Sequence, residues 1–367
     1  YMDKYMDQFN WDKTFYQELD INEGDVLKIG KMRNIFEDNT KSGSKLDIIP
    51  NCPYILQPII RQPFDYKIKS VSFSKSIEGH EINNTDCWDV SAQNNGGVRL
   101  WISNTDGDGN VDVVIGQTAG VYANPSSGYL FSFIGNTIDA TIDLSNFNTT
   151  RTNDMNHMFY CCKTVLSINV SGFDTSKATT MNHMFYGCKN VTALDVNGFN
   201  TYQVTNMYYM FGFCSNLVTI DVTRFDTSKV TNMGKMFYTC SKLTSLDLSN
   251  FDTSNVTSML MMFYGDNLLQ TLYVSEKWNI DKVVNTVNTE SSIPVANQLM
   301  FYGCTQLVGG SGTVYNASNE NDLAYAHIDE GQTNPGYLTY KQPTTPTPTN
   351  NSTSTTSSVS GNQSTSL

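Results

Sequence analysis

One phrase of 26 residues occurs five times between Ile142 and about Thr271, with no insertion or deletion. Each copy opens on an aliphatic residue, has a phenylalanine five positions later, and carries a methionine and then a Met-Phe pair in its second half. A fixed period with fixed apolar positions indicates a solenoid, because each copy is one coil that can bury its apolar face only against its neighbours. The repeated positions are Ile142, Ile168, Leu194, Ile220 and Leu246; Phe147, Phe173, Phe199, Phe225 and Phe251; Met155, Met181, Met207, Met233 and Met259; and the pairs at 158/159, 184/185, 210/211, 236/237 and 262/263.

Two periodicities within each coil predict its secondary structure. The opening, such as residues 246–249, alternates apolar and polar side chains, which predicts a short strand. The later part has apolar residues at i, i+3, i+4 and i+7, which predicts one face of a short helix. In the second coil these residues are Met181, Met184, Phe185 and Cys188. One short parallel strand plus one short helix per 26-residue coil is a leucine-rich-repeat-like solenoid.

The repeat sequence FDTSKVTNMGKMFYTCSKLTSLDLSNFDTSNVTSM resembles the repeats of BspA-like leucine-rich-repeat surface proteins of bacteria. The resemblance extends from Ile68 to about Tyr340, and its motifs are specific in the repeats and less specific in the flanks. It implies a secreted or surface-displayed interaction module, which in some members is an adhesin. It names no ligand.

The repeats divide the chain into five parts. A solenoid needs caps, because its ends would otherwise present apolar surface and free strand edges. We predict an N-terminal segment of unknown role, partly helical, at 1–67; a small β-rich N-terminal cap at 68–141; the solenoid at 142–304; a C-terminal cap at 305–340; and a Thr/Ser/Pro-rich disordered stalk at 341–367.

An irregular coil is predicted on each side of the regular ones. Leu130-Phe131 precedes the first Met-Phe pair by 28 residues and predicts a degenerate first coil. A sixth coil opens on schedule at Leu272, but its pair Met300-Phe301 comes 12 residues late, so the extra residues within 278–298 must bulge as a loop. Such insertions often contact partners. A solvated bulge without a ligand is the alternative.

Four of the eight cysteines repeat at one register, and a fifth follows the sixth Met-Phe pair at the same spacing. At the inward i+7 position these thiols are expected to form a buried column of small apolar groups. Bridges between coils are the alternative, because a spacing of about 5 Å permits them. Cys52 and Cys87 lie outside the column and are better placed for a bridge. The column is Cys162, Cys188, Cys214, Cys240 and Cys304.

Composition argues against several classes of function. The net charge of −12 argues against nucleic acid, because a backbone-binding surface must neutralise phosphates with Lys and Arg. No run of 18 apolar residues occurs, so we expect no membrane insertion by this fragment. The sequence has no HExxH motif, nucleophile elbow or phosphate loop, so we predict no enzymatic activity, no catalytic residue and no cofactor.

Repetition turns each register position into a column of side chains about 5 Å apart, and two columns are candidate ligand-binding surfaces. Neighbouring carboxylates on the outward side of the strands repel by about 1 kcal/mol in water, which favours a cation or a cationic partner; a solvated polar face is the alternative. Tyrosines on the helical flank offer amphipathic rings to sugars or peptides; simple packing is the alternative. The strand-face candidates are Asp143, Asn169, Asp195, Asp221, Asp247 and Tyr273, and the flank candidates are Tyr160, Tyr186, Tyr238 and Tyr264.

Two further patterns resemble metal sites, and neither predicts one. His157 and His183 are one coil apart, but their column continues as Tyr209, Lys235 and Met261, which are not zinc ligands. Oxygen-bearing side chains stand at alternate positions as in calcium loops, at Asp106, Asp108, Asn110 and Asp112, but the glycine expected at the sixth position and the glutamate expected at the twelfth are missing. An Asp-Gly turn between alternating apolar runs predicts a hairpin there.

These features predict a non-enzymatic, surface-displayed binding module, an adhesin or host-interaction protein that recognises an extracellular protein or glycan through the solenoid faces. The alternative is a rigid structural spacer that presents another domain. We expect a bacterial cell-surface or secreted protein anchored by elements outside this fragment. The chain starts at Tyr1 without a leader and stops inside the stalk, so we expect both ends to have been trimmed.

Overall fold

A computed structural model describes residues 36–37, 67–83, 86–89, 96–105, 110–118, 120–123, 125, 127–128, 130–131, 140–283, 299–318 and 323–342. Four sequence predictions concern residues outside these ranges: the N-terminal helix, a bridge involving Cys52, most of the inserted loop, and the stalk beyond Gln342.

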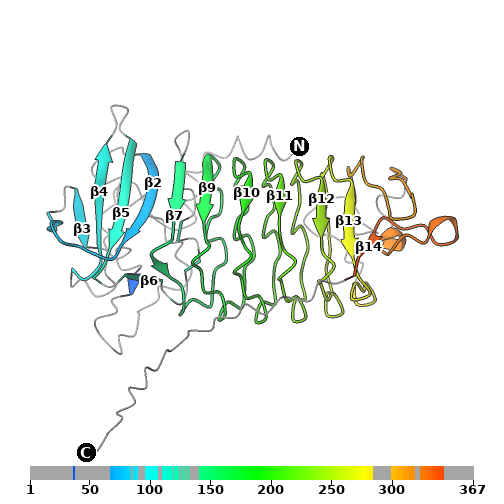
Figure 1. The fold of residues 1–367 in the computed structure, drawn as a ribbon, viewed down its shortest axis with the longest axis horizontal. Coiled ribbons are helices and arrows are strands. Elements are labelled where there is room, and N and C mark those ends of the chain that lie inside the picture. The colour runs from blue at the N-terminus through cyan, green and yellow to red at the C-terminus, as the bar shows by residue number, and fades with distance from the viewer. Residues whose placement is uncertain are drawn as a thin grey trace, which may run out of the picture.

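The coils stack side by side along the long axis of the molecule (Figure 1). Register partners such as Ile142 and Ile168, or Leu246 and Leu272, pair in parallel one 26-residue period apart. The prediction that residues one period apart are neighbours is therefore confirmed, and the parallel sheets fit a strand-rich repeat solenoid. The strands of successive coils are β7 (Ala140–Asp143), β9 (Val165–Asn169), β10 (Ala193–Leu194), β11 (Thr219–Ile220), β12 (Ser245–Asp247) and β13 (Thr271–Val274).

A β-rich unit lies at the N-terminal end of the stack and shares its sheet. The sheet order is β3-β4-β5-β2-β7-β9, in which β2 pairs in parallel with both β5 and β7. Strands β4 and β5, which are consecutive in the chain, pair antiparallel, as the predicted hairpin requires, while its Asp-Gly residues at 106–109 lie outside the described ranges. The strands of this unit are β2 (Lys67–Ser74), β3 (Cys87–Asp89), β4 (Arg99–Thr105) and β5 (Asn110–Gly116), and a separate small sheet joins β1 (Phe36–Glu37), β6 (Val121–Ala123) and β8 (Phe147–Asn148).

The prediction of one helix per coil is wrong: the described residues contain no α-helix. The second half of each coil is instead a run of tight turns in which alternate N–H groups bond within and between coils. Met184 N–H donates to Met181 O at 3.2 Å, whereas Phe185 N–H donates to Met210 O of the next coil at 2.9 Å. His183 has a φ of 56°, a left-handed conformation that interrupts any right-handed helix.

The apolar spacing nevertheless identified the correct inward side chains. Phe159, Phe185 and Phe211 are fully buried, and their rings stack at centroid distances of 5.2 and 5.7 Å. Phe131 continues the column below Phe159 at 5.6 Å, as expected for a degenerate first coil. At the other end Phe301 stacks on Phe263 at 6.0 Å despite the insertion. One apolar core therefore runs through all coils.

The cysteine column is buried, as predicted, and none of its five cysteines forms a disulfide. Each thiol also donates to the carbonyl of the phenylalanine one coil back, for example Cys188 Sγ to Phe159 O at 3.2 Å and Cys240 Sγ to Phe211 O at 3.0 Å. Because a thiol is a small apolar group with a weak donor, it fills this position without leaving the carbonyl poorly satisfied. The same contact is made by Cys162, Cys214 and Cys304.

A buried threonine column joins the coils on another side. Thr175 Oγ1 donates to Asn200 O at 3.0 Å and accepts from Asn200 N–H at 2.7 Å. A threonine can do both because its hydroxyl is a donor and an acceptor, so each coil is tied to the next by side chain as well as by backbone. The column comprises Thr149, Thr175, Thr201, Thr227 and Thr253.

The C-terminal cap adds the last strand to the sheet of the final coils. Strand β14 (Thr339–Tyr340) pairs in parallel with β13, and the cap also contains two short 3-10 helices, η2 (Leu323–Tyr325) and η3 (Gly331–Thr333). Tyr337 is fully buried and packs edge-on against Phe301 at 5.3 Å. In the part of the chain that the structure describes, no helix is long and apolar enough to cross a bilayer.

Candidate functional site

Two surfaces carry the predicted site residues. The strand face is formed by the outward residues of the strands, from Asp143 to Tyr273. The turn face, which replaces the predicted helical flank, is formed by the tight turns in the second half of each coil and carries Tyr160, Tyr186, Tyr238 and Tyr264. Both sets are brought into columns by the stacking described above, so they can be compared as binding surfaces.

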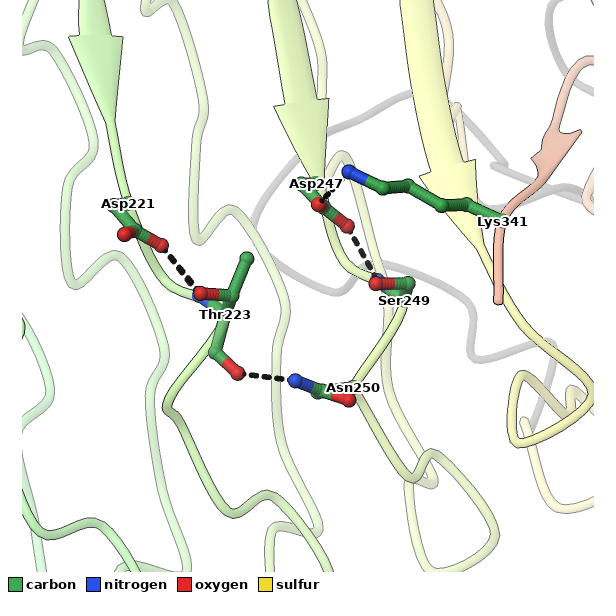
Figure 2. Close-up of polar contacts among 6 residues, drawn as sticks. All are labelled: Asp221, Thr223, Asp247, Ser249, Asn250 and Lys341. Carbon is green, nitrogen blue, oxygen red and sulfur yellow. Dashed lines mark hydrogen bonds and ion pairs between the residues drawn. The ribbon is translucent and has the colours of Figure 1, made fainter. Parts of the chain in front are cut away.

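The acids of the strand face have a structural function. Asp221 Oδ1 accepts from the N–H and hydroxyl of Thr223 at 3.0 and 2.6 Å, and Asp247 Oδ1 accepts from Ser249 N–H at 3.0 Å (Figure 2). This local bond is an Asx turn, which ends the strand and redirects the chain. It explains why aspartate or asparagine recurs here without invoking a ligand. The same backbone bond occurs at Asp143, Asn169 and Asp195.

The C-terminal end of the strand face is covered by the chain itself. Lys341 Nζ forms an ion pair with Asp247 Oδ2 (Figure 2), and it also lies 5.3 Å from the centre of the Tyr273 ring. Burial by itself raises the pKa of Asp247, but the hydrogen bonds from Lys341 and Ser249 outweigh it, and the net pKa is lowered. Asp247 and Tyr273 are therefore already engaged, which leaves Asp143, Asp195 and Asp221 as the exposed acids of this face.

No cation site is built by these acids. Among the described residues, no group of three or more His, Cys, Asp or Glu is arranged to hold a metal ion. The repulsion between neighbouring carboxylates is instead reduced by the turn N–H groups that each one faces. The carboxylates of the strand face are thus bonded mainly by the N–H groups of their own turns.

The turn face is a row of stacked aromatic rings. Tyr160 and Tyr186 stack at 4.9 Å with nearly parallel planes, and Tyr238, Tyr264 and Tyr302 continue the row at 4.9 and 4.7 Å. Tyr302 is 40% exposed, Tyr160, Tyr186 and Tyr264 are half-buried, and Tyr238, within the row, is buried.

Gly212 does not break this row, because a neighbouring ring fills its place. A Cβ atom at Gly212 would lie 2.5 Å from the Tyr209 ring, so only glycine leaves room for that ring. Tyr209 meets Tyr186 and Tyr238 edge-on at 5.1 and 5.7 Å. The sequence contained a signal for this exchange. In the third coil, Tyr209 stands where the first two coils have histidine, and Gly212 stands where they have tyrosine.

The histidine column extends the aromatic surface and is neutral at pH 7. His157 and His183 stack at 4.3 Å, and burial lowers their pKa values to about 3 and about 4. Lys235, one coil beyond Tyr209, adds a cation to this surface, with its Nζ 4.8 Å from the centre of the Tyr209 ring. The turn face therefore combines aromatic rings with the ammonium group of a buried lysine, Lys235.

Residues 130–219 and 212–325 match the family described as Mycoplasma protein of unknown function, DUF285. Together the two matches cover more than half of the 367 residues. The chain belongs to this family. No curated protein and no solved structure matches it. In this DUF285 protein, both the strand face and the turn face lie within the matched residues.

One residue of this DUF285 protein was missed by the sequence analysis. Asp266 stands one period after Cys240, in the cysteine column, and is fully buried. Its Oδ1 accepts from Cys240 N–H at 2.7 Å, and burial raises its pKa well above 3.8. The signal was available, because extending the cysteine register by one more period leads directly to this acid.

Proposed function

We propose that this chain is a non-enzymatic binding module that recognises an extended extracellular protein or glycan along its turn face. The observation that carries the proposal is the row of rings from Tyr160 to Tyr302, in which the buried Tyr238 lies between the partly exposed Tyr160 and Tyr186 on one side and Tyr264 and Tyr302 on the other. Aromatic side chains supply large contact areas at low cost in conformational entropy, and their hydroxyl groups add hydrogen bonds. The acids of the strand face, in contrast, are largely used by their own turns.

The repeat resemblance supports the wider setting of this proposal. Repeats similar to those of BspA-like leucine-rich-repeat proteins imply display at a bacterial surface or secretion, with an adhesive role in some members. Partly exposed rings at both ends of the row suit an extended partner, because such a partner can contact rings of several coils at once. The competing function is a rigid spacer, which the uninterrupted core also supports.

A double substitution on the turn face separates the two functions. We expect Y160A/Y186A to weaken binding at least tenfold, about 1.4 kcal/mol or more, because it removes two adjacent rings. The matched control is Y202A, which removes a tyrosine that is 49% exposed and lies outside the row. Binding is measured by surface plasmon resonance against arrayed glycans and immobilised extracellular-matrix proteins.

Both variants are first compared with the parent protein by circular dichroism and thermal unfolding. Equal loss of binding in Y160A/Y186A and Y202A would contradict the assignment to the turn face. If the folded parent protein binds no arrayed glycan or matrix protein, the rigid spacer is the better account.

A further inference from the structure

A cleft of about 320 Å³ lies at the C-terminal end of the molecule. One wall is the segment 278–281, which follows β13, and the other is the segment 326–334 of the C-terminal cap. None of its lining residues belongs to the strand face or the turn face. Clefts of this size are typical of small-ligand sites.

The walls of the cleft are held in place by the protein itself. Trp278 Nε1 donates across the cleft to Ala326 O at 3.0 Å, which fixes the indole against the opposite wall. His327 Nδ1 lies 2.7 Å from Ile328 O, and a Cβ atom at Gly336 would lie only 2.9 Å from that nitrogen. The imidazole is thus closely packed, and its orientation is set before any ligand arrives.

Each wall carries a side-chain amide paired with a carboxylate. Asn279 Nδ2 donates to Asp281 Oδ2 at 3.1 Å on one wall, and Asn334 Nδ2 donates to Glu330 Oε2 at 2.9 Å on the other. These pairs place planar polar groups around a half-buried indole. Planar acceptors beside an aromatic ring match the two surfaces of a sugar, whose hydroxyl groups lie at its edge and whose C–H groups lie on its face.

The charge of the cleft limits its ligands further. Asp281 and Glu330 are two carboxylates on opposite walls, so an anionic ligand would be repelled. Within the described part of the chain these acids and His327 do not form a metal-binding group. Carboxylate oxygens accept hydrogen bonds from hydroxyl groups without any need for ligand charge.

We propose that this cleft binds a neutral saccharide, with the Trp278 indole against the sugar face and the two amide–carboxylate pairs bonded to its hydroxyl groups. The proposal is independent of the turn face. A lysine side chain of a peptide is the competing ligand, because it would also suit an indole beside two carboxylates.

The test is isothermal titration calorimetry of the whole chain with neutral trisaccharides of glucose, mannose, galactose and N-acetylglucosamine, and with trilysine as the competing probe. We expect at least one trisaccharide to bind saturably. Its dissociation constant should change by less than about twofold at about 0.5 M NaCl, because the ligand is uncharged. We expect W278A to weaken it at least tenfold and W278F by about threefold, because phenylalanine keeps an aromatic face.

Two further variants keep the proposal falsifiable if W278A disturbs the cap. E330A/N334A removes only exposed side chains and should weaken saccharide binding at least tenfold, whereas Y160A/Y186A should leave it unchanged. The proposal is overturned if none of the four trisaccharides binds, or if E330A/N334A binds as well as the parent protein. Salt-sensitive binding of trilysine alone would assign the cleft to a cationic peptide instead.

Discussion

Replacing Asp329 with alanine will unfold the C-terminal cap. Its carboxylate is buried and accepts from Ser311 N–H at 2.8 Å, from the N–H and hydroxyl of Thr313 at 3.0 and 2.7 Å, and from Gly331 N–H at 3.0 Å. Gly336 N–H adds a longer contact at 3.3 Å. Alanine leaves these donors without their shared acceptor, so we expect a loss of roughly 3 kcal/mol or more, measured by urea unfolding.

The matched control is D195A. Asp195 is exposed and accepts one local N–H, that of Asn197 at 3.2 Å, so its removal should cost less than about 1 kcal/mol. Hydrogen exchange should show the D329A loss first in residues 307–340. Equal stability of D329A and D195A would contradict the account of the cap.

The pH dependence of this effect has a definite sign. Burial alone raises the pKa of Asp329, but the hydrogen bonds from Thr313, Gly331 and Ser311 outweigh it, and the net pKa lies below 3.8. Because the folded-state pKa is lowered, the carboxylate stabilises the fold fully above about pH 4, and this stabilisation is lost as the pH falls through the folded pKa. The difference between the parent protein and D329A should therefore shrink in acid.

Replacing Asp266 with cysteine will stabilise the protein at pH 8. The carboxyl group is fully buried, and its Oδ2 has no hydrogen-bond partner among the described residues. Cysteine restores the residue type of the column, and Cys240 N–H retains its bond to Phe237 O at 3.0 Å. Removing a poorly satisfied buried carboxyl group should gain about 1–3 kcal/mol, measured by urea unfolding under reducing conditions.

Here the pH dependence has the opposite sign. Burial raises the folded-state pKa of Asp266 above 3.8. The buried carboxyl group therefore destabilises the folded state least below pH 3.8, and the free energy of unfolding falls as the pH rises toward the folded-state pKa. The gain in D266C should therefore be small at pH 4 and larger at pH 8. D266N, which is neutral at every pH and nearly isosteric, should show the same trend. A gain that does not change between these pH values would contradict a buried, protonated Asp266.

The sequence predicted the inward side chains better than it predicted the backbone. The positions of Met184, Phe185 and Cys188 were correct, because burial depends on the repeated pattern alone. The helix was wrong because the same spacing also fits consecutive tight turns, and no local pattern shows that Phe185 N–H bonds to the next coil rather than to its own. Lys341 on Asp247, and the cleft beside Trp278, join segments far apart in sequence, so periodicity could not have found them.

The central claim, that residues 26 positions apart are direct neighbours, is tested most directly by engineered disulfides on the strand face. Ala193 and Thr219 are exposed register partners on β10 and β11. Adjacent strands lie about 4.8 Å apart, within the range of a disulfide, whereas strands two coils apart are about 10 Å apart and beyond it. On mild oxidation, A193C/T219C should form an intramolecular disulfide detected by mass spectrometry, and A193C/S245C should not. No bridge in the first pair, or equal bridging in both, would contradict the stack.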